Sequence, residues 1–185
     1  MINNLDSYNI ILASASPRRQ QLLKDIGVKF KTQLKPVKEE FPDRLKHFEI
    51  SDYLAQLKAI PFKESLKEND ILITSDTIVW HNNTMLGKPK NYEDAHKMLS
   101  ALSNSTHEVI TSVCFTTTEF EKTHNSTTKV TFSELKDEAI DYYINTYKPF
   151  DKAGAYGIQE WIGQIGVKKI EGSYYNVVGL SLIHI

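Results

Sequence analysis

Residues 8–27 constrain the fold most, because they predict a buried strand that runs directly into a capped helix. Residues 8–13 (YNIILA) form a short apolar run that is typical of a buried strand. Ser16 is a good N-cap, Pro17 fits the first helical position, and Gly27 suits the left-handed position just after a helix. A strand that leads at once into a helix is a building block of α/β proteins, so we expect that class.

The rest of the chain alternates between strand-like and helix-like patterns, without internal repeats or low-complexity linkers. We therefore predict an α/β fold with a mixed β-sheet in two lobes flanked by helices, a central substrate cleft, and one domain over residues 1–185. Strands are expected at 28–34, 70–74, 78–80, 108–118 and 129–132, and a hairpin at 164–170 and 174–180. Helices are expected at 50–67 (interrupted by Pro61), 91–102 (capped by Asn91) and 137–147. Turns are expected at Asn82–Asn83 and at 124–126.

Composition excludes several classes of protein. The 22 basic and 23 acidic residues give a net charge of −1, so no overall positive field attracts nucleic acid, and a polyanionic ligand needs a local cationic cluster. Apolar stretches are only a few residues long and no export signal is apparent, which predicts a cytoplasmic protein that does not span a membrane. The single Cys114 excludes an internal disulfide, and its apolar neighbours favour a buried core thiol over a nucleophile.

Residues 14–19 (SASPRR) could form an anion site where the first strand meets the first helix. The N-terminus of a helix presents unpaired N–H groups and a partial positive charge, and two arginines flank it here. The alternative is that Ser16 acts only as a cap and that both arginines are solvated. Residue types alone do not decide between these interpretations. No P-loop and no GxGxxG pattern is present.

Other candidate residues are ambiguous when each is taken alone. Asp76 follows an apolar strand, and open α/β sheets place their clefts at strand ends, but a lone Asp there is more often a turn-former. Lys58 and Lys88 are individually typical of a solvated surface. Residues 151–159 (DKAGAYGIQ) combine small residues, which allow a ligand close to the backbone, with Gln159, whose amide can read a base edge although a loop Gln is usually solvated.

Five short segments occur in a consistent order and spacing along nearly the whole chain: residues 12–19, 75–79, 86–89, 107–111 and 151–159. Together they closely resemble the Maf family of nucleotide pyrophosphatases. The last segment is similar to the subfamily that hydrolyses dTTP and UTP, rather than to the sister group that acts on 7-methyl-GTP. The resemblance implies a fold like that of inosine triphosphate pyrophosphatases, hydrolysis of a nucleoside triphosphate to monophosphate and pyrophosphate, a divalent cation (Mg²⁺ or Mn²⁺), and a homodimer.

The resemblance also implies roles for acidic residues. Asp76 aligns with the catalytic acidic residue of the family, the proposed proton acceptor. Glu40 matches an acidic residue near the metal. An ordinary carboxylate is a weak base towards bulk water, so its role becomes reasonable when a metal lowers the pKa of the attacking water or when Asp76 itself binds the ion.

Substrate-binding roles follow from the same resemblance. Arg18, Thr77 and Gln159 align with positions linked to substrate choice. The positions expected to hold phosphates are Ser14, Ser16, Arg19, Lys58 and Lys88.

Three departures from the family pattern and two other functions bear on this interpretation. Glu160 stands where Gly commonly follows the Gln, Ser181 replaces a common Pro, and the chain stops at Ile185 without the usual C-terminal helix. The family is also associated with arrest of septum formation, which makes a regulatory interaction protein one alternative. A 7-methyl-GTP pyrophosphatase is the other. Nucleic-acid binding is disfavoured by the neutral charge balance and the absence of a basic, aromatic stripe.

Overall fold

The structure, a computed structural model, describes Leu5 and residues 7–181. Two compact units can be distinguished. Unit 1 comprises the described residues up to Asp76, Thr111–Ser126 and the stretch that starts at Gly179; unit 2 comprises Thr77–Ile110 and Thr127–Val178. The expected absence of a last helix after Ile185 concerns a chain end that lies outside the described residues.

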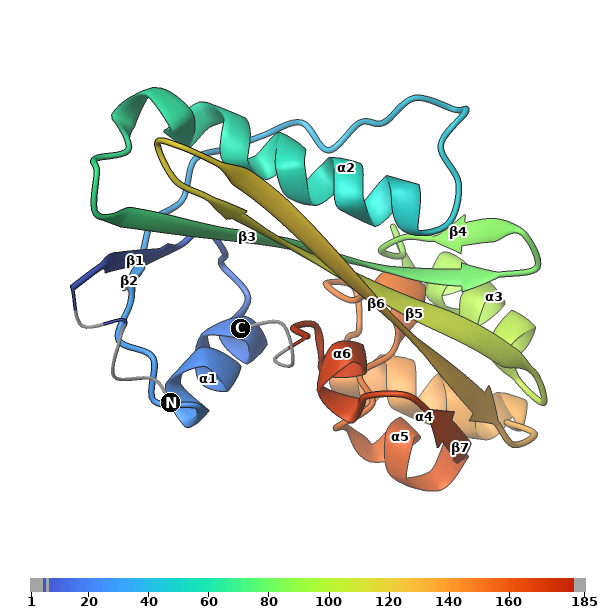
Figure 1. Ribbon diagram of the computed structural model, residues 1–185. Coiled ribbons are helices and arrows are strands. Elements are labelled where there is room, and N and C mark those ends of the chain that lie inside the picture. Colours follow the sequence, from blue (N-terminus) through green and yellow to red (C-terminus); the bar gives the residue numbers. More distant parts are fainter. Residues whose placement is uncertain (1–4, 6, 182–185) are drawn as a thin grey trace. The chain divides into compact units, whose positions relative to one another are not determined.

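The described strands form a seven-stranded mixed sheet in the order β2-β1-β3-β5-β6-β7, with β4 paired to β3 (Figure 1). β1 is parallel to β2 and β3, whereas β4 is antiparallel to β3 and β7 to β6. This confirms the predicted α/β class with a mixed sheet. The strands are β1 (Asn9–Leu12), β2 (Lys31–Thr32), β3 (Asp70–His81), β4 (Thr84–Leu86), β5 (Thr106–Thr116), β6 (Glu121–Phe132) and β7 (Val167–Glu171).

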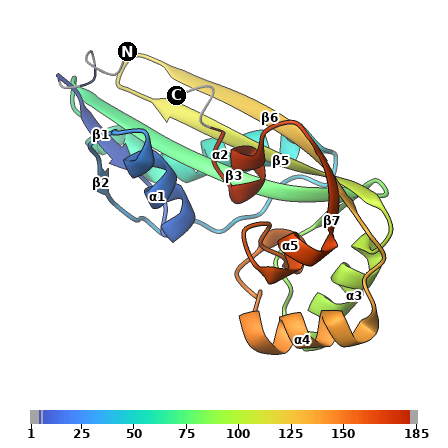
Figure 2. The same cartoon turned by 90° about the horizontal axis from the view of Figure 1, so that it is seen from below.

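In unit 1, two helices lie on opposite faces of β1 and β3 (Figures 1 and 2). α1 (Pro17–Asp25) begins at the predicted Ser16 cap, whose hydroxyl accepts from the backbone N–H of Arg19. α2 (Phe48–Ala59) ends where the predicted interruption lies and continues as a 3-10 helix, η1 (Ile60–Ser65), since a proline cannot extend an α-helix.

The prediction of two short strands around Asp76 is wrong, because β3 runs through this position without a break. The polar residues in its middle are buried yet have partners. The Thr74 hydroxyl donates to the Ala55 carbonyl oxygen (2.7 Å), and Asp76 accepts from Lys58. Buried polar groups with hydrogen-bond partners are tolerated inside a sheet, so the strand does not have to end there.

The turn predicted around residues 124–126 is also wrong, since these residues lie within β6. The chain reverses direction between Thr116 and Glu121 instead. There the Thr117 hydroxyl accepts from the backbone N–H groups of Glu119 and Phe120, each at 3.1 Å. A threonine side chain that satisfies turn N–H groups thus fixes the reversal at residues 117–120, before the predicted turn at 124–126.

Unit 2 has its own hydrophobic core, which includes Leu99, Phe132, Ile144 and Ile162. The predicted Asn91 cap and the Asn82–Asn83 hairpin turn are both present, the latter with positive φ at both residues. The predicted C-terminal hairpin is wrong, because helices flank β7. The helical elements are α3 (Tyr92–Leu102), α4 (Asp137–Tyr147), η2 (Ala153–Ala155), α5 (Trp161–Gly166) and α6 (Tyr174–Val178).

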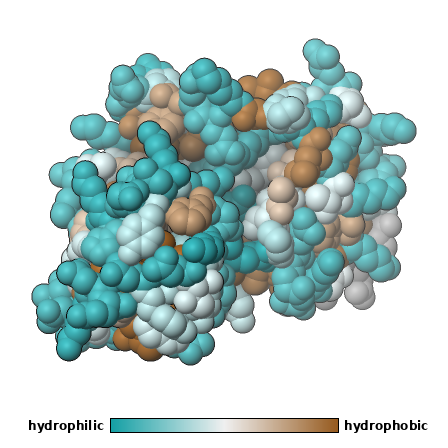
Figure 3. Space-filling view, turned by 180° about the vertical axis from the view of Figure 1, so that it is seen from behind, coloured by the Kyte–Doolittle hydropathy of each residue, from teal (hydrophilic) through white to brown (hydrophobic). Residues whose placement is uncertain are grey.

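Buried and exposed apolar groups follow ordinary globular packing. Cys114 is fully buried, as its apolar neighbours predicted. On the face drawn in Figure 3, hydrophobic residues form small patches among hydrophilic ones. No helix within the described residues is long and apolar enough to cross a membrane.

Replacing Gly154 by alanine is expected to lower the free energy of unfolding by about 2 kcal/mol. Gly154 has a φ of +68°, and a Cβ there would lie 2.9 Å from a methyl carbon of Val79. Gly87→Ala is the control, because a Cβ at Gly87 meets Met85 Cε at an ordinary 3.9 Å. Urea unfolding of both variants measures the difference. Equal stability of the two would contradict the close approach at Gly154.

Candidate active site

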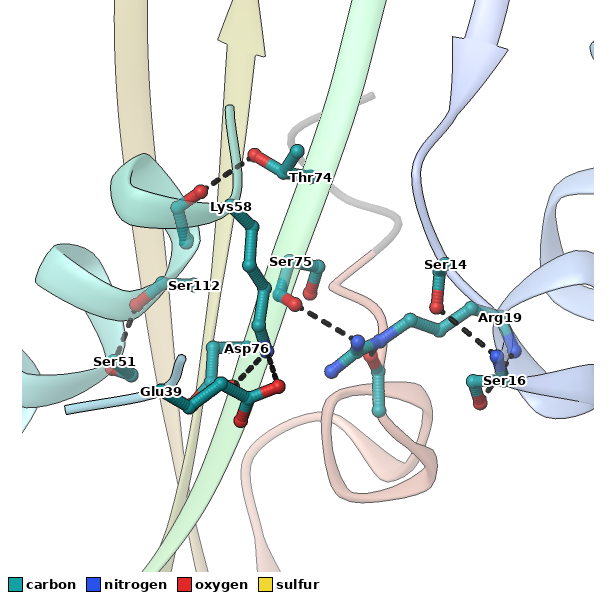
Figure 4. Close-up of polar contacts among 12 residues, drawn as sticks. Ser14, Ser16, Arg19, Glu39, Ser51, Lys58, Thr74, Ser75, Asp76 and Ser112 are labelled. Carbon is teal, nitrogen blue, oxygen red and sulfur yellow. Dashed lines mark hydrogen bonds and ion pairs between the residues drawn. The ribbon is translucent and has the colours of Figure 1, made fainter. Parts of the chain in front are cut away.

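One face of β3 directs a polar side chain toward α2. Side chains alternate along a strand, so Leu72, Thr74 and Asp76 share a face. Leu72 packs with Ala59 at the end of α2. Thr74 donates to the main chain of the same helix, and Asp76 meets Lys58 (Figure 4). The apolar and polar contacts of β3 with α2 therefore fix where the Asp76 carboxylate lies.

Lys58 connects two carboxylates. Its Nζ lies 2.6 Å from Asp76 Oδ1 and 3.2 Å from Glu39 Oε1 (Figure 4). The Lys58 and Asp76 side chains are 18% and 9% exposed, whereas that of Glu39 is 44% exposed. A cation and two anions are thus collected at one place, with Glu39 on the side open to solvent.

Glu40, which the family resemblance implies to be near a metal, pairs with a different lysine. Its carboxylate contacts Lys38 Nζ at 2.6 Å, and its side chain is 69% exposed. The neighbouring Glu39 is the glutamate that reaches the lysine of Asp76. Nothing in the EE pair itself distinguishes the two residues, so the sequence alone offered no signal for Glu39.

Arg19 is held between two parts of unit 1. Its Nε donates to the Gly179 carbonyl oxygen at 2.7 Å, and its Nη1 donates to the Ser75 carbonyl oxygen at 2.9 Å. Burial lowers the pKa of the Arg19 guanidinium, an effect that the Asp76 carboxylate opposes and the Arg18 guanidinium reinforces. The two guanidinium groups on α1 are therefore close enough to influence each other, and that of Arg19 also lies near the β3 carboxylate.

The two serines of residues 14–19 organise the start of α1. Ser14 Oγ accepts from the backbone N–H of Ser16 at 3.2 Å, and Ser16 Oγ accepts from that of Arg19 at 3.5 Å. The prediction that Ser16 caps α1 is thus confirmed. A cap does not exclude an anion site, since one side chain leaves other N–H groups of the first turn to be satisfied.

Three other predicted residues belong to unit 2. Thr77 is half-buried on β3, and Lys88 and Gln159 are exposed. The segments that carry the last two come together, because the backbone N–H of Gly154 donates to the Gly87 carbonyl oxygen at 3.0 Å. Unit 2 therefore gathers Lys88 and residues 151–159 in one region.

His107 packs against the same region of unit 2. Its Nε2 lies 2.7 Å from the Tyr156 hydroxyl, and its ring contacts Phe132 edge to face. Burial, with a smaller effect of His81, lowers the pKa of His107 to about 3. The ring is therefore neutral at pH 7.

Comparison with known proteins now decides the family. The model of the family described as Maf-like protein matches residues 9–185. This chain belongs to the Maf family. All five segments that carry the resemblance fall within the matched range.

Curated relatives of this Maf protein carry a specific name. The dTTP/UTP pyrophosphatase of Flavobacterium johnsoniae is 62% identical over 177 residues, which cover 95% of this chain and 91% of the relative. The protein of the same name from Flavobacterium psychrophilum is 58% identical, and the match covers 90% of that relative. Among solved structures, the Staphylococcus aureus Ham1 protein aligns with a TM-score of 0.49 and 16% identity, over 70% of this chain and 72% of that one.

Proposed function

We propose that this Maf protein hydrolyses dTTP and UTP to the nucleoside monophosphate and pyrophosphate. The names of the close relatives support the substrate class. The observation that carries the proposal is the contact of Lys58 with both Asp76 and Glu39, near the guanidinium of Arg19. Acidic and basic groups gathered in this way suit a reaction in which a proton must be accepted and phosphate charge must be offset.

The proposed reaction is an in-line displacement at the α-phosphorus. A water oxygen forms a bond to the α-phosphorus while the bond to the oxygen bridging the α- and β-phosphorus breaks. The water proton passes to the Asp76 carboxylate, and pyrophosphate leaves with the electron pair of the broken bond. Arg18, Arg19, Lys58 and Lys88 are proposed to offset the charge of the phosphates, and Ser14 and Ser16 to donate hydrogen bonds to them.

A divalent cation fits the acidic residues of unit 1. No group of three or more His, Cys, Asp or Glu side chains able to hold a metal occurs among the described residues. Mg²⁺ does not need one, because proteins usually bind it through one or two carboxylates together with substrate phosphates and water. We propose that Asp76 and Glu39 supply those carboxylates, in preference to Glu40. When bound, Mg²⁺ or Mn²⁺ offsets phosphate charge and lowers the pKa of water.

Base recognition is proposed for unit 2, with Gln159 and Thr77, and with Arg18 as a third residue linked to substrate choice. The Gln159 amide has one acceptor and two donors, which can complement the imide edge of thymine or uracil. The proposal further includes a single Maf-like domain over residues 1–185, a cytoplasmic location and a homodimer. The septum-arrest and 7-methyl-GTP alternatives are not favoured by the names of the relatives.

Pyrophosphate release from a nucleotide panel tests the proposed function. We expect kcat/KM for dTTP and UTP to exceed that for dATP, dGTP and 7-methyl-GTP by at least about tenfold. We also expect activity with Mg²⁺ or Mn²⁺ to disappear in EDTA and to return when the metal is restored. Preference for a purine nucleotide would overturn the substrate assignment. Absence of hydrolysis for every nucleotide would favour an interaction protein.

A further inference from the structure

Gln159 lies in a turn whose two ends are connected by one buried side chain. The backbone N–H of Glu160 donates to the Gly157 carbonyl oxygen at 3.0 Å, which makes residues 157–160 a β-turn with Gln159 at its third position. The Tyr143 hydroxyl accepts from the Gly157 N–H at 3.0 Å and donates to the Glu160 carboxylate. Tyr143 is fully buried, so this connection is formed away from water.

Glu160 is the second fixed point of the turn. Its Oε1 lies 3.2 Å from Lys152 Nζ, and the Lys152 and Glu160 side chains are only 9% and 20% exposed. Burial and the hydrogen bond to Glu160 raise the pKa of Tyr143, so its hydroxyl keeps its proton and acts as a donor. The Glu160 carboxylate is thus held from two sides in a largely dehydrated position, where its charge acts strongly on nearby groups.

The Gln159 amide is close to that carboxylate. A Cβ at Gly157 would lie 3.1 Å from both Gln159 Nε2 and Glu160 Oε1, so the two atoms flank the same small space beside this glycine. A negative charge favours the NH₂ side of an amide over its carbonyl oxygen. Because Glu160 Oε1 borders the same space as Gln159 Nε2, its charge favours the amide orientation in which Nε2 lies toward Gly157.

The orientation of an amide matters for the choice between pyrimidines. Thymine and uracil present an acceptor at position 4 and a donor at position 3, and cytosine presents the reverse. A carboxamide that turns by 180° exchanges its acceptor and donor, so a Gln that turns freely complements either pattern. A Gln held in one orientation complements only one of them.

We propose that Glu160, held by Tyr143 and Lys152, is a positioning residue that orients the Gln159 amide and makes the protein prefer thymine and uracil nucleotides to cytosine nucleotides. The inference rests on the proposed function, in which Gln159 contacts the base. It gives a role to the glutamate that replaces the usual family glycine at this position.

The test compares kcat/KM for dTTP and dCTP in the full-length protein. Glu160→Gln keeps the shape of the side chain and an acceptor for Tyr143 but removes the charge, and we expect the dTTP/dCTP ratio to fall about tenfold. Tyr143→Phe removes the hydroxyl and is expected to lower the ratio as well. Glu171→Gln is the control, since it removes an exposed carboxylate of unit 2 that pairs with Lys169, and its ratio is expected to match that of the wild type.

The ratio separates positioning from stability, because a partly unfolded preparation loses activity on both nucleotides in equal proportion. Suppose that the wild type prefers dTTP to dCTP and that the dTTP/dCTP ratio of Glu160→Gln stays within about twofold of the wild-type ratio. That result overturns this inference and leaves the proposed function intact. A wild type that releases no pyrophosphate from dTTP overturns the proposed function and this inference with it. A wild type without preference between the two nucleotides overturns the inference while leaving hydrolysis intact.

Discussion

Asp76→Asn is expected to lower kcat about 10³-fold while triphosphate binding remains largely intact. Asparagine has nearly the shape of aspartate and can still accept from Lys58, which contacts Asp76 at 2.6 Å. It cannot take up the water proton and is a poorer metal ligand. Steady-state pyrophosphate release gives kcat, and calorimetric titration with a non-hydrolysable dTTP analogue gives the dissociation constant.

Asp70→Asn is the matched control for that experiment. Asp70 is a buried aspartate on the same strand, and it accepts from Asn9 and from the backbone N–H of Lys67. Its replacement costs stability but removes nothing from the Asp76 cluster, so kcat per folded molecule is expected to stay near that of the wild type. Near-normal turnover in Asp76→Asn would rule out the assignment of Asp76 as the proton acceptor.

Glu39→Gln is expected to lower kcat/KM about 10²-fold, and at least about tenfold more than Glu40→Gln. The two glutamates are adjacent, and each is paired with a lysine. Glu39 contacts the lysine that also contacts Asp76, whereas Glu40 contacts the exposed Lys38. Metal titrations of pyrophosphate release add a second measurement, in which Glu39→Gln should require more Mg²⁺ for half-maximal activity.

The adjacent pair makes the outcome unambiguous. Both substitutions remove one negative charge from the same loop, so effects of net charge cancel in the comparison. If Glu40→Gln is the more damaging, the assignment drawn from the family resemblance is correct and the one drawn from the contact with Lys58 is wrong.

Features that depend on neighbours in sequence were predictable. The Ser16 and Asn91 caps, the end of α2 near Pro61 and the Asn82–Asn83 turn all arise from the chemistry of a few consecutive residues. The sheet class followed from the same local patterns. These features remain correct in the structure because no distant contact opposes them.

Features that depend on distant partners were not predictable. Polar residues in the middle of β3 suggested a turn. Their hydrogen-bond partners, however, are Ala55 and Lys58 of α2, which lie much earlier in the sequence. The choice between Glu39 and Glu40 depends on how a loop without regular structure returns to α2. The role of Glu160 depends on Tyr143, which lies 17 positions earlier.

The uninterrupted course of β3 limits how the chain length can vary. One residue inserted between Ile73 and Asp76 would turn the Asp76 side chain to the opposite face of the sheet, away from Lys58. Two inserted residues would restore the face but move the carboxylate about 7 Å along the strand. Insertions are far better tolerated at the turn between Thr116 and Glu121. Ile73 is a residue of β3 that pairs with β1. The number of residues between Ile73 and Asp76 is therefore as important to the site as the types of residue that it contains.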